Sequence, residues 1–283
     1  MIKKTTNYII KSTAKPTLLD VAFEQNNRTK PIVVFVHGFK GFKDWGHFNL
    51  VHQRLAESGF VALKFNFSHN GGTLDNPIDF PDLEAFGNNT YTKELDDLGA
   101  IIDWVSDDEN PLIPQSEKDV KQIYLIGHSR GGGITILKAN EDSRVKKIVT
   151  WAAVSDFEKR FPKGEELENW KKNQVTYIQN ARTKQQMPLY YSFYEDFLQN
   201  KDRLNIPNAE QNLKIPHLII HGEKDEVVNV SEAEYLHKLN PASELLIIPN
   251  TGHTFDVKHP FTANQLPQPA QLVLNKTIEF LKK

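Results

Sequence analysis

The stretch IYLIGHSRGGG, residues 123–133, joins an apolar run to a serine flanked by glycines and then to a helix-like segment. It contains the pattern G-x-S-x-G in the strand-to-helix context of a nucleophile elbow. The tight turn strains the backbone at Ser129, and Gly127 and Gly131 let neighbouring chain pass close to it. The pattern predicts a serine hydroxyl held above the end of a strand, at the start of a helix. A pattern with three fixed positions also arises by chance, so the surrounding sequence has to support it.

Short apolar runs surround this elbow and predict the buried strands of a parallel sheet. The six runs are residues 31–36, 61–67, 122–126, 145–153, 215–220 and 245–249. Amphipathic stretches at 48–58 and 90–104 lie between them and predict helices. Strand alternating with helix is typical of an α/β fold with a mostly parallel, doubly wound sheet. Two earlier pieces, residues 8–10 and 18–23, predict an antiparallel hairpin at one edge.

Two intervals between the runs exceed the roughly 30 residues of a strand–helix–strand unit. Residues 68–89 are rich in Gly, Asn, Asp and Pro, which predicts a long loop over the sheet edge. Residues 155–212 follow the fourth run and predict a helical cap insertion, with amphipathic pieces at 165–179 and 188–200. We therefore expect one core domain interrupted once by a cap: core residues 1–155 and 207–283, cap residues 156–206.

A serine hydroxyl is a weak nucleophile, so it needs a histidine base that a carboxylate orients. Asp225 lies in the loop that leaves the fifth run, and His253 follows the sixth run. The carboxyl ends of parallel strands meet at one edge of a sheet, so Ser129, Asp225 and His253 can converge. Their order along the chain is the one expected for an elbow serine.

The sequence leaves alternatives to two members of this set. A loop carboxylate at Asp225 could simply be solvated, and a histidine at 253 could be a turn residue. The acids that compete with Asp225 are Glu223, Glu226 and Asp156, and the histidines that compete with His253 are His221 and His259. Asp225 and His253 fit the expected positions best.

An oxyanion needs N–H donors, and the chain turns directly after the first buried run at VHGF, residues 36–39. The backbone N–H groups of Phe39 and of Arg130, the residue after the serine, would form the oxyanion hole. Gly38 leaves room for the substrate. The alternative is an ordinary glycine turn.

These motifs together resemble the α/β-hydrolase superfamily from the first run to the final helix. The elbow, the His-Gly-Phe turn, His-Gly-x-x-Asp-x-x-Val at 221–228 and Gly-His at 252–253 carry the resemblance. Within the superfamily the chain is similar to dienelactone-hydrolase-like and cinnamoyl/feruloyl-type esterases. Dienelactone hydrolases proper use a cysteine nucleophile, which this chain lacks, and Ser129 excludes the aspartate-nucleophile branch.

We therefore expect a serine hydrolase that cleaves carboxylic esters through a Ser129–His253–Asp225 triad and an acyl-enzyme. Peptide or amide cleavage, thioester hydrolysis and acyl transfer could use the same triad, and an inactive binding protein is the alternative outside enzymes. Aromatic and apolar side chains of the cap and of the loop after Phe39 would line the substrate pocket, or would only pack the cap onto the core. The candidates are Phe42, Trp45, Met187, Tyr190, Tyr191, Phe193, Tyr194 and Phe197.

Composition narrows the remaining classes. The 283 residues include no cysteine, which excludes disulfides and thiolate chemistry, and 34 Lys and Arg against 36 Asp and Glu offer no nucleic-acid footprint. No segment approaches the roughly 18 apolar residues of a membrane helix, and the first apolar piece is too short for a signal peptide. No phosphate-binding loop or H-E-x-x-H motif is present. We expect a cytoplasmic protein that acts on a small-molecule ester without a metal or cofactor, and a homodimer remains open.

Overall fold

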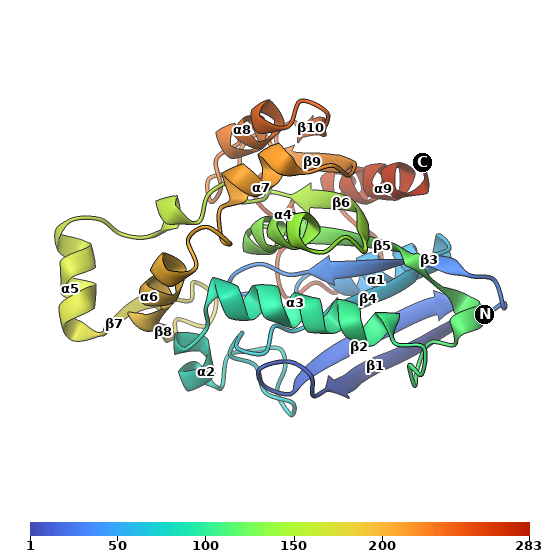
Figure 1. The fold of residues 1–283 in the computed structure, drawn as a ribbon, viewed down its shortest axis with the longest axis horizontal. Coiled ribbons are helices and arrows are strands. Elements are labelled where there is room, and N and C mark those ends of the chain that lie inside the picture. Colours follow the sequence, from blue (N-terminus) through green and yellow to red (C-terminus); the bar gives the residue numbers. More distant parts are fainter.

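A computed structural model describes residues 1–283. Its central sheet has eight strands in the order β1-β2-β4-β3-β5-β6-β9-β10 (Figure 1). The strands are β1 Ile2–Ile10, β2 Thr17–Glu24, β3 Lys30–Val36, β4 Val61–Phe65, β5 Lys118–His128, β6 Val145–Trp151, β9 His217–Gly222 and β10 Glu244–Ile248. The six strands from β4 to β10 in this order are parallel, whereas β1 and β2 form an antiparallel hairpin that continues the sheet. The predicted α/β sheet, its six core strands and its edge hairpin are confirmed.

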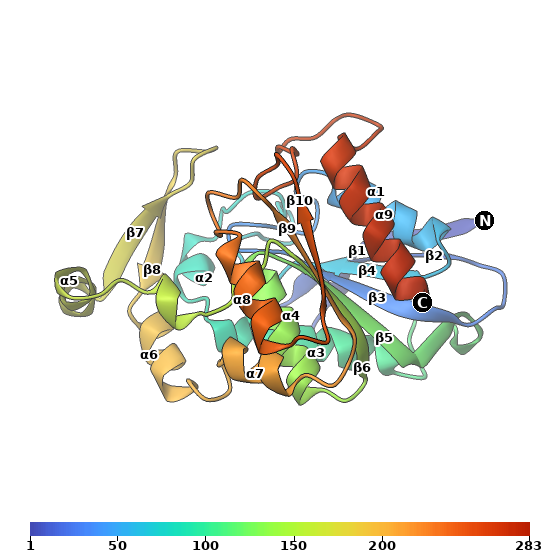
Figure 2. The same cartoon turned by 90° about the horizontal axis from the view of Figure 1, so that it is seen from above.

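Helices cover both faces of this sheet (Figure 2). One face carries α1, Phe48–Glu57, and α9, Gln268–Lys282. The other face carries four helices: α3 Tyr91–Ser106, α4 Arg130–Glu141, α7 Ile206–Asn212 and α8 Ser231–Leu239. Burial on both faces explains why the parallel strands read as continuous apolar runs rather than alternating ones.

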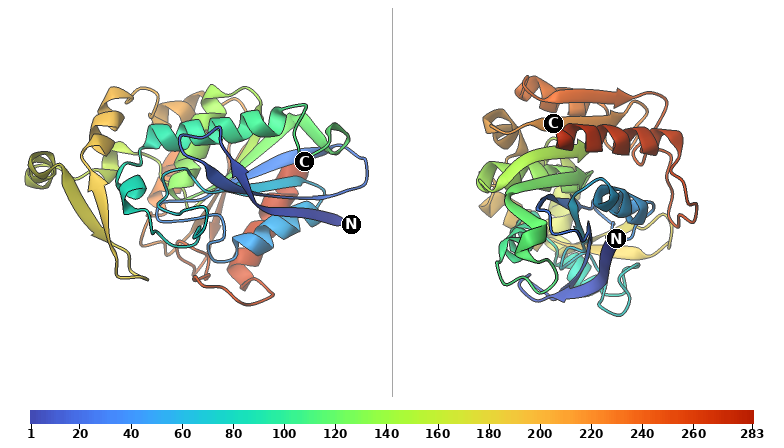
Figure 3. Two further views of the ribbon diagram at one scale, coloured as in Figure 1. Left: turned by 90° about the horizontal axis from the view of Figure 1, so that it is seen from below. Right: turned by 90° about the vertical axis from the view of Figure 1, so that its right-hand side faces the viewer.

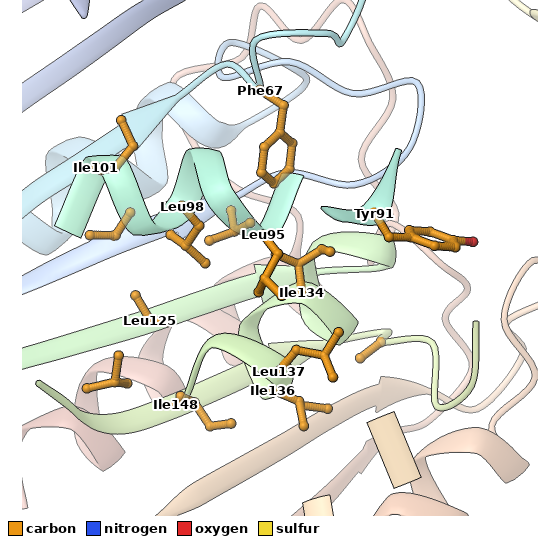
Figure 4. Packing of buried hydrophobic residues seen from close by; sticks show 14 of the residues in the cluster. Phe67, Tyr91, Leu95, Leu98, Ile101, Leu125, Ile134, Ile136, Leu137 and Ile148 are labelled. Atoms are coloured by element: carbon orange, nitrogen blue, oxygen red, sulfur yellow. The ribbon is translucent and has the colours of Figure 1, made fainter. Parts of the chain in front are cut away.

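The larger core cluster lies between the sheet and α3 and α4. Leu95 and Leu98 of α3, Ile134 of α4 and Leu125 of β5 are all fully buried (Figure 4). Burying each such side chain contributes about 1.5–3 kcal/mol relative to leaving it exposed. Helix α3 begins at a defined point because the Thr90 side chain accepts a hydrogen bond from the Lys93 N–H. This packing fixes α4, and with it Ser129, the residue that precedes α4.

The chain between β6 and β9 differs from the expected all-helical cap. Helix α5, Glu165–Asn173, ends at Gln174, whose φ of 60° is left-handed, and an antiparallel hairpin of β7, Val175–Gln179, and β8, Gln186–Tyr190, follows. Helix α6, Ser192–Gln199, comes next. The helical prediction for 165–179 and 188–200 was therefore wrong over the hairpin. The β-branched and aromatic residues of β7 favour a strand once Gln174 has ended the helix.

The loop over residues 68–89 has the expected irregular course, except for the short helix α2, Leu83–Gly87. Figure 3 shows β1 and β10 at opposite edges of the sheet. Both chain termini lie at the end of the molecule opposite the segment from α5 to α6 (Figures 1 and 2). None of the helices is long and apolar enough to cross a membrane.

Candidate active site

The elbow places Ser129 between β5 and α4 with φ 57° and ψ −121°, a conformation that non-glycine residues rarely adopt. Its N–H donates to the Trp151 carbonyl of the next strand at 2.8 Å. A Cβ on Gly127 would lie 2.4 Å from the Gly131 oxygen, and one on Gly131 would lie 2.4 Å from the His37 oxygen. Both positions therefore require glycine, because the backbone of the elbow packs directly against itself and against the end of β3.

Ser129, His253 and Asp225 form one hydrogen-bonded chain. The Ser129 Oγ lies 2.9 Å from Nε2 of His253, and Nδ1 of His253 lies 2.7 Å from Oδ2 of Asp225. The Asp225 side chain is fully buried and the His253 side chain is 14% exposed, so solvent reaches the imidazole but not the carboxylate. The structure thus brings together the three residues that the sequence selected. This arrangement lets a base take the serine proton while a carboxylate holds the imidazole.

Asp225 is fixed by more than its bond to His253. Its Oδ1 accepts hydrogen bonds from the backbone N–H groups of Val227 and Val228 at 2.8 and 2.9 Å. His221 approaches Oδ2 at 3.2 Å and also lies 2.8 Å from the Val228 carbonyl. Burial acts to raise the pKa of Asp225, but hydrogen bonds from His221 and His253 hold it well below its usual value. The carboxylate therefore stays charged where the imidazole needs it.

None of the competing residues takes the place of Asp225 or His253 in the hydrogen-bonded chain. His221 contacts Asp225 but makes no hydrogen bond to Ser129, a role that was not predicted although its spacing of four residues from Asp225 could have suggested it. His259 accepts a hydrogen bond from the Gly46 N–H. Glu223 and Glu226 are exposed, and Asp156 accepts from the Glu158 N–H. None of these carboxylates is hydrogen-bonded to His253.

His128, the variable residue of the elbow, supports the loop that carries His253. Its Nε2 lies 3.0 Å from the His253 carbonyl oxygen, and the two rings are 4.9 Å apart. Burial, followed by the nearby His253, lowers the pKa of His128 to about 3, so the ring is neutral at neutral pH. Because a carbonyl only accepts, the proton must sit on Nε2 of His128. No sequence motif predicts this contact.

The turn after β3 approaches the serine closely. A Cβ on Gly38 would lie 2.9 Å from Cβ of Ser129 and 3.4 Å from its Oγ. The Phe39 N–H makes no hydrogen bond within the chain. Arg130 is the first residue of α4, where a backbone N–H has no acceptor in its own helix. Two unpaired N–H groups thus flank Ser129, which is the requirement for binding an oxyanion.

A buried charge network anchors the loop that follows Phe39. Nζ of Lys43 lies 2.9 Å from Oδ1 of Asp20, whose Oδ2 lies 2.6 Å from Nζ of Lys64. Burial would raise the pKa of Asp20, but Lys64 and Lys43 lower it to about 2. The Lys43 N–H also donates to the Asn66 side chain at 2.7 Å. Because unpairing a buried charge is costly, this network holds the loop onto β2 and β4.

A cavity of about 1190 Å³ opens above Ser129 and His253, and 17 of its 32 lining residues are hydrophobic. Three of the expected pocket residues, Phe42, Trp45 and Phe193, line it. The other five lie outside its lining. Four of them pack into the core or against neighbouring aromatic rings: Met187, Tyr191, Tyr194 and Phe197. The fifth, Tyr190, donates a hydrogen bond from its hydroxyl to Glu84. For those five, the alternative that they only pack the insertion onto the rest of the protein holds. Other insertion residues take their place in the lining: Phe161, Trp170, Ile178 and Leu189.

Residues 20–283 match the sequence model of the Dienelactone hydrolase family. The chain belongs to this family. A putative esterase/lipase of Mycoplasma pneumoniae is 23% identical to this dienelactone hydrolase family member over 250 residues, covering 81% of this chain and 84% of the relative. By family the protein is a hydrolase.

Solved structures share the fold of this family member across almost the whole chain. Est1E from Butyrivibrio proteoclasticus, which has also been solved with ferulic acid bound, superposes with a TM-score of 0.69, 18% identity and 98% coverage of both chains. A putative hydrolase from Agrobacterium vitis gives a TM-score of 0.70 with 16% identity and full coverage of both chains. These likenesses confirm the predicted α/β-hydrolase fold.

Proposed function

We propose that this dienelactone hydrolase family member is a serine carboxylesterase. One observation carries the proposal: the hydrogen-bonded chain from Asp225 through His253 to Ser129 opens onto a largely apolar cavity. The strained conformation of Ser129 supports it, because such strain persists only where the surrounding structure imposes it. Two unpaired N–H groups beside the hydroxyl complete the set that acyl transfer needs.

The proposed reaction has two halves. Oγ of Ser129 attacks the ester carbonyl while Nε2 of His253 takes its proton, and the N–H groups of Phe39 and Arg130 stabilise the oxyanion. His253 then gives that proton to the departing alcohol oxygen, which leaves an acyl group on Ser129. Water, deprotonated by His253, attacks the acyl-enzyme; the bond to Oγ of Ser129 then breaks, His253 returns the proton to that oxygen, and the acid leaves. Asp225 stays ionised throughout and stabilises the imidazolium.

The proposed substrate is a small-molecule ester with an apolar or aromatic acyl group. Aromatic side chains from both the loop after Phe39 and the insertion line the cavity, including Phe42, Trp45 and Trp170. The ferulic acid bound in Est1E, which shares this fold, is an aromatic acid of that kind. We propose that residues 156–206 act as the cap that sets this preference, and that the enzyme works in the cytoplasm without a metal or cofactor.

Hydrolysis of paired substrates tests the proposal. We expect wild-type protein to cleave p-nitrophenyl esters and methyl ferulate, and to cleave the matching p-nitroanilide much more slowly. Ser129→Ala should fold with the same circular dichroism spectrum and lose ester turnover. Equal turnover by purified Ser129→Ala would overturn the role of Ser129, and faster anilide than ester cleavage would favour an amidase.

A further inference from the structure

The side chain of Arg130 lies against the loop that carries the other N–H group of the proposed oxyanion hole. Its guanidinium carbon lies 3.8 Å from the centroid of the Phe39 ring. Phe39 carries the other proposed oxyanion donor, and its ring is in turn stacked on Phe86 of α2 at 5.5 Å. Arg130 therefore joins the start of α4 to the loop after β3 through a contact that the triad does not use.

An ion pair with Glu94 also fixes the position of the guanidinium. Its Nη1 donates to Oε1 of Glu94 on α3 at 3.3 Å, and the Asn89 side chain donates to the same oxygen at 2.7 Å. The Arg130 and Glu94 side chains are 11% and 4% exposed. Oε2 of Glu94 has no hydrogen-bond partner. Arg130 is the only cation paired with this buried carboxylate. An ion pair this deeply buried has a well-defined geometry because separating it is costly.

Aromatic rings from α3 and from the insertion complete the surroundings of the guanidinium. It lies 5.0 Å from the centroid of Tyr91 and 5.4 Å from that of Phe193 on α6. Tyr91 packs against Phe193 at 4.6 Å and stacks face to face on Phe157 at 3.7 Å. The Arg130 side chain thus contacts Phe39 in the loop after β3, the core helix α3 and the insertion.

We propose that Arg130 is a positioning residue: its guanidinium clamps Phe39 so that the two oxyanion donors keep a fixed separation, and it couples that separation to the placement of the insertion. The inference rests on the proposed esterase function. Cation–π contacts strengthen when they are desolvated, as here. Every substitution of Arg130 except proline keeps its backbone N–H, so a side-chain variant tests the clamp without deleting a donor.

Arg130→Met keeps the length and apolar stem of the side chain and removes the planar cation. We expect kcat for a p-nitrophenyl ester to fall about 10- to 100-fold with little change in KM, because the loss falls on the transition state. Affinity for an aryl trifluoromethyl ketone, which forms a tetrahedral oxyanion on serine, should fall by a similar factor. Arg130→Lys should recover part of both losses, because it restores the cation.

Arg144→Met is the matched control. Arg144 also pairs with carboxylates, Asp142 and Asp103, but it lies just beyond the other end of α4. We expect kcat, KM and ketone affinity to equal those of wild type, with at most a small change in melting temperature.

A double-mutant cycle with Phe39→Leu keeps the proposal testable if Arg130→Met is poorly stable. Phe39→Leu also leaves its backbone N–H in place, so it removes only the ring that the guanidinium contacts. If Arg130 acts through Phe39, the double variant should lose no more kcat than the worse single variant. Losses that multiply would overturn the clamp.

The outcomes separate the clamp from the function on which it rests. If wild type cleaves the ester and binds the ketone, and Arg130→Met behaves in the same way, the clamp alone is overturned. A rise in KM without loss of kcat or ketone affinity would overturn it too, since it would make Arg130 a substrate contact. A wild-type protein that neither cleaves the ester nor binds the ketone would overturn both.

Discussion

Replacing His47 with phenylalanine should make the protein more resistant to acid. His47 is 3% exposed, and its Nδ1 has no hydrogen-bond partner. Its ring lies nearly parallel to that of Trp151, with centroids 6.3 Å apart and planes at 6°. Phenylalanine retains an aromatic ring of similar size and cannot take up a proton. The substitution therefore removes a buried titrating group and keeps its packing.

Burial lowers the pKa of His47 from 6.5 to about 4. In the unfolded chain the ring takes up a proton as the pH falls through 6.5, whereas in the folded protein it stays neutral until the pH nears 4. Stability from this group is therefore present above pH 6.5 and lost as the pH falls towards 4. At about 1.4 kcal/mol per pH unit, lowering the pH from 6.5 to 5 costs about 2 kcal/mol.

Urea unfolding of wild type and His47→Phe at pH 7 and pH 5 measures this loss. The difference in unfolding free energy between the two proteins should shift by about 2 kcal/mol in favour of the variant at pH 5. Buried His37, His52 and His128 also have lowered pKa values, but they titrate in both proteins and cancel in the comparison. A difference that is the same at both pH values would refute the assignment of a neutral, buried His47.

Three further substitutions test the site and the core. Gly38→Ala would place a Cβ 2.9 Å from Cβ of Ser129, so kcat should fall about 100-fold in a protein that melts normally; unchanged kcat would show that the turn yields. Asp225→Asn removes the acceptor of the His253 Nδ1 proton, and kcat should fall about 10³- to 10⁴-fold; a loss under tenfold would argue for another acid. Burial raises the pKa of Asp97 to about 6, so stability from this group is present below pH 4 and lost as the pH rises through 6. In urea unfolding, Asp97→Asn should therefore gain about 2–3 kcal/mol on wild type between pH 4 and pH 7, and parallel curves would contradict this.

The core sheet was predictable because its strands are buried on both faces and therefore appear as apolar runs. Residues 31–36 and 145–153 are examples, and β3 and β6 occupy them. The insertion was harder, because β7 pairs only with β8 in a two-stranded sheet and much of its surface is exposed. Its sequence lacks a strong period, and only the left-handed Gln174 separates helix from strand. Local periodicity cannot locate such a break.

The reacting residues were predictable because each follows a strand in a fixed order, and an elbow serine needs glycines at set positions. Side-chain partners across the site were not. His128 reaches the His253 carbonyl, and Arg130 reaches Phe39, through contacts between segments far apart in the chain. The prediction of the cavity lining was wrong in part for a related reason. Tyr191 and Phe197 are aromatic residues of the insertion, but they face the core. Composition identifies such a segment without orienting its side chains.

The central claim is that Ser129 is an activated nucleophile. Incubation with a fluorophosphonate probe, followed by intact mass measurement and peptide mapping, tests it most directly. We predict one adduct per chain, located on Ser129 and absent from Ser129→Ala. No adduct on the folded wild-type protein, or an adduct at another residue, would contradict it.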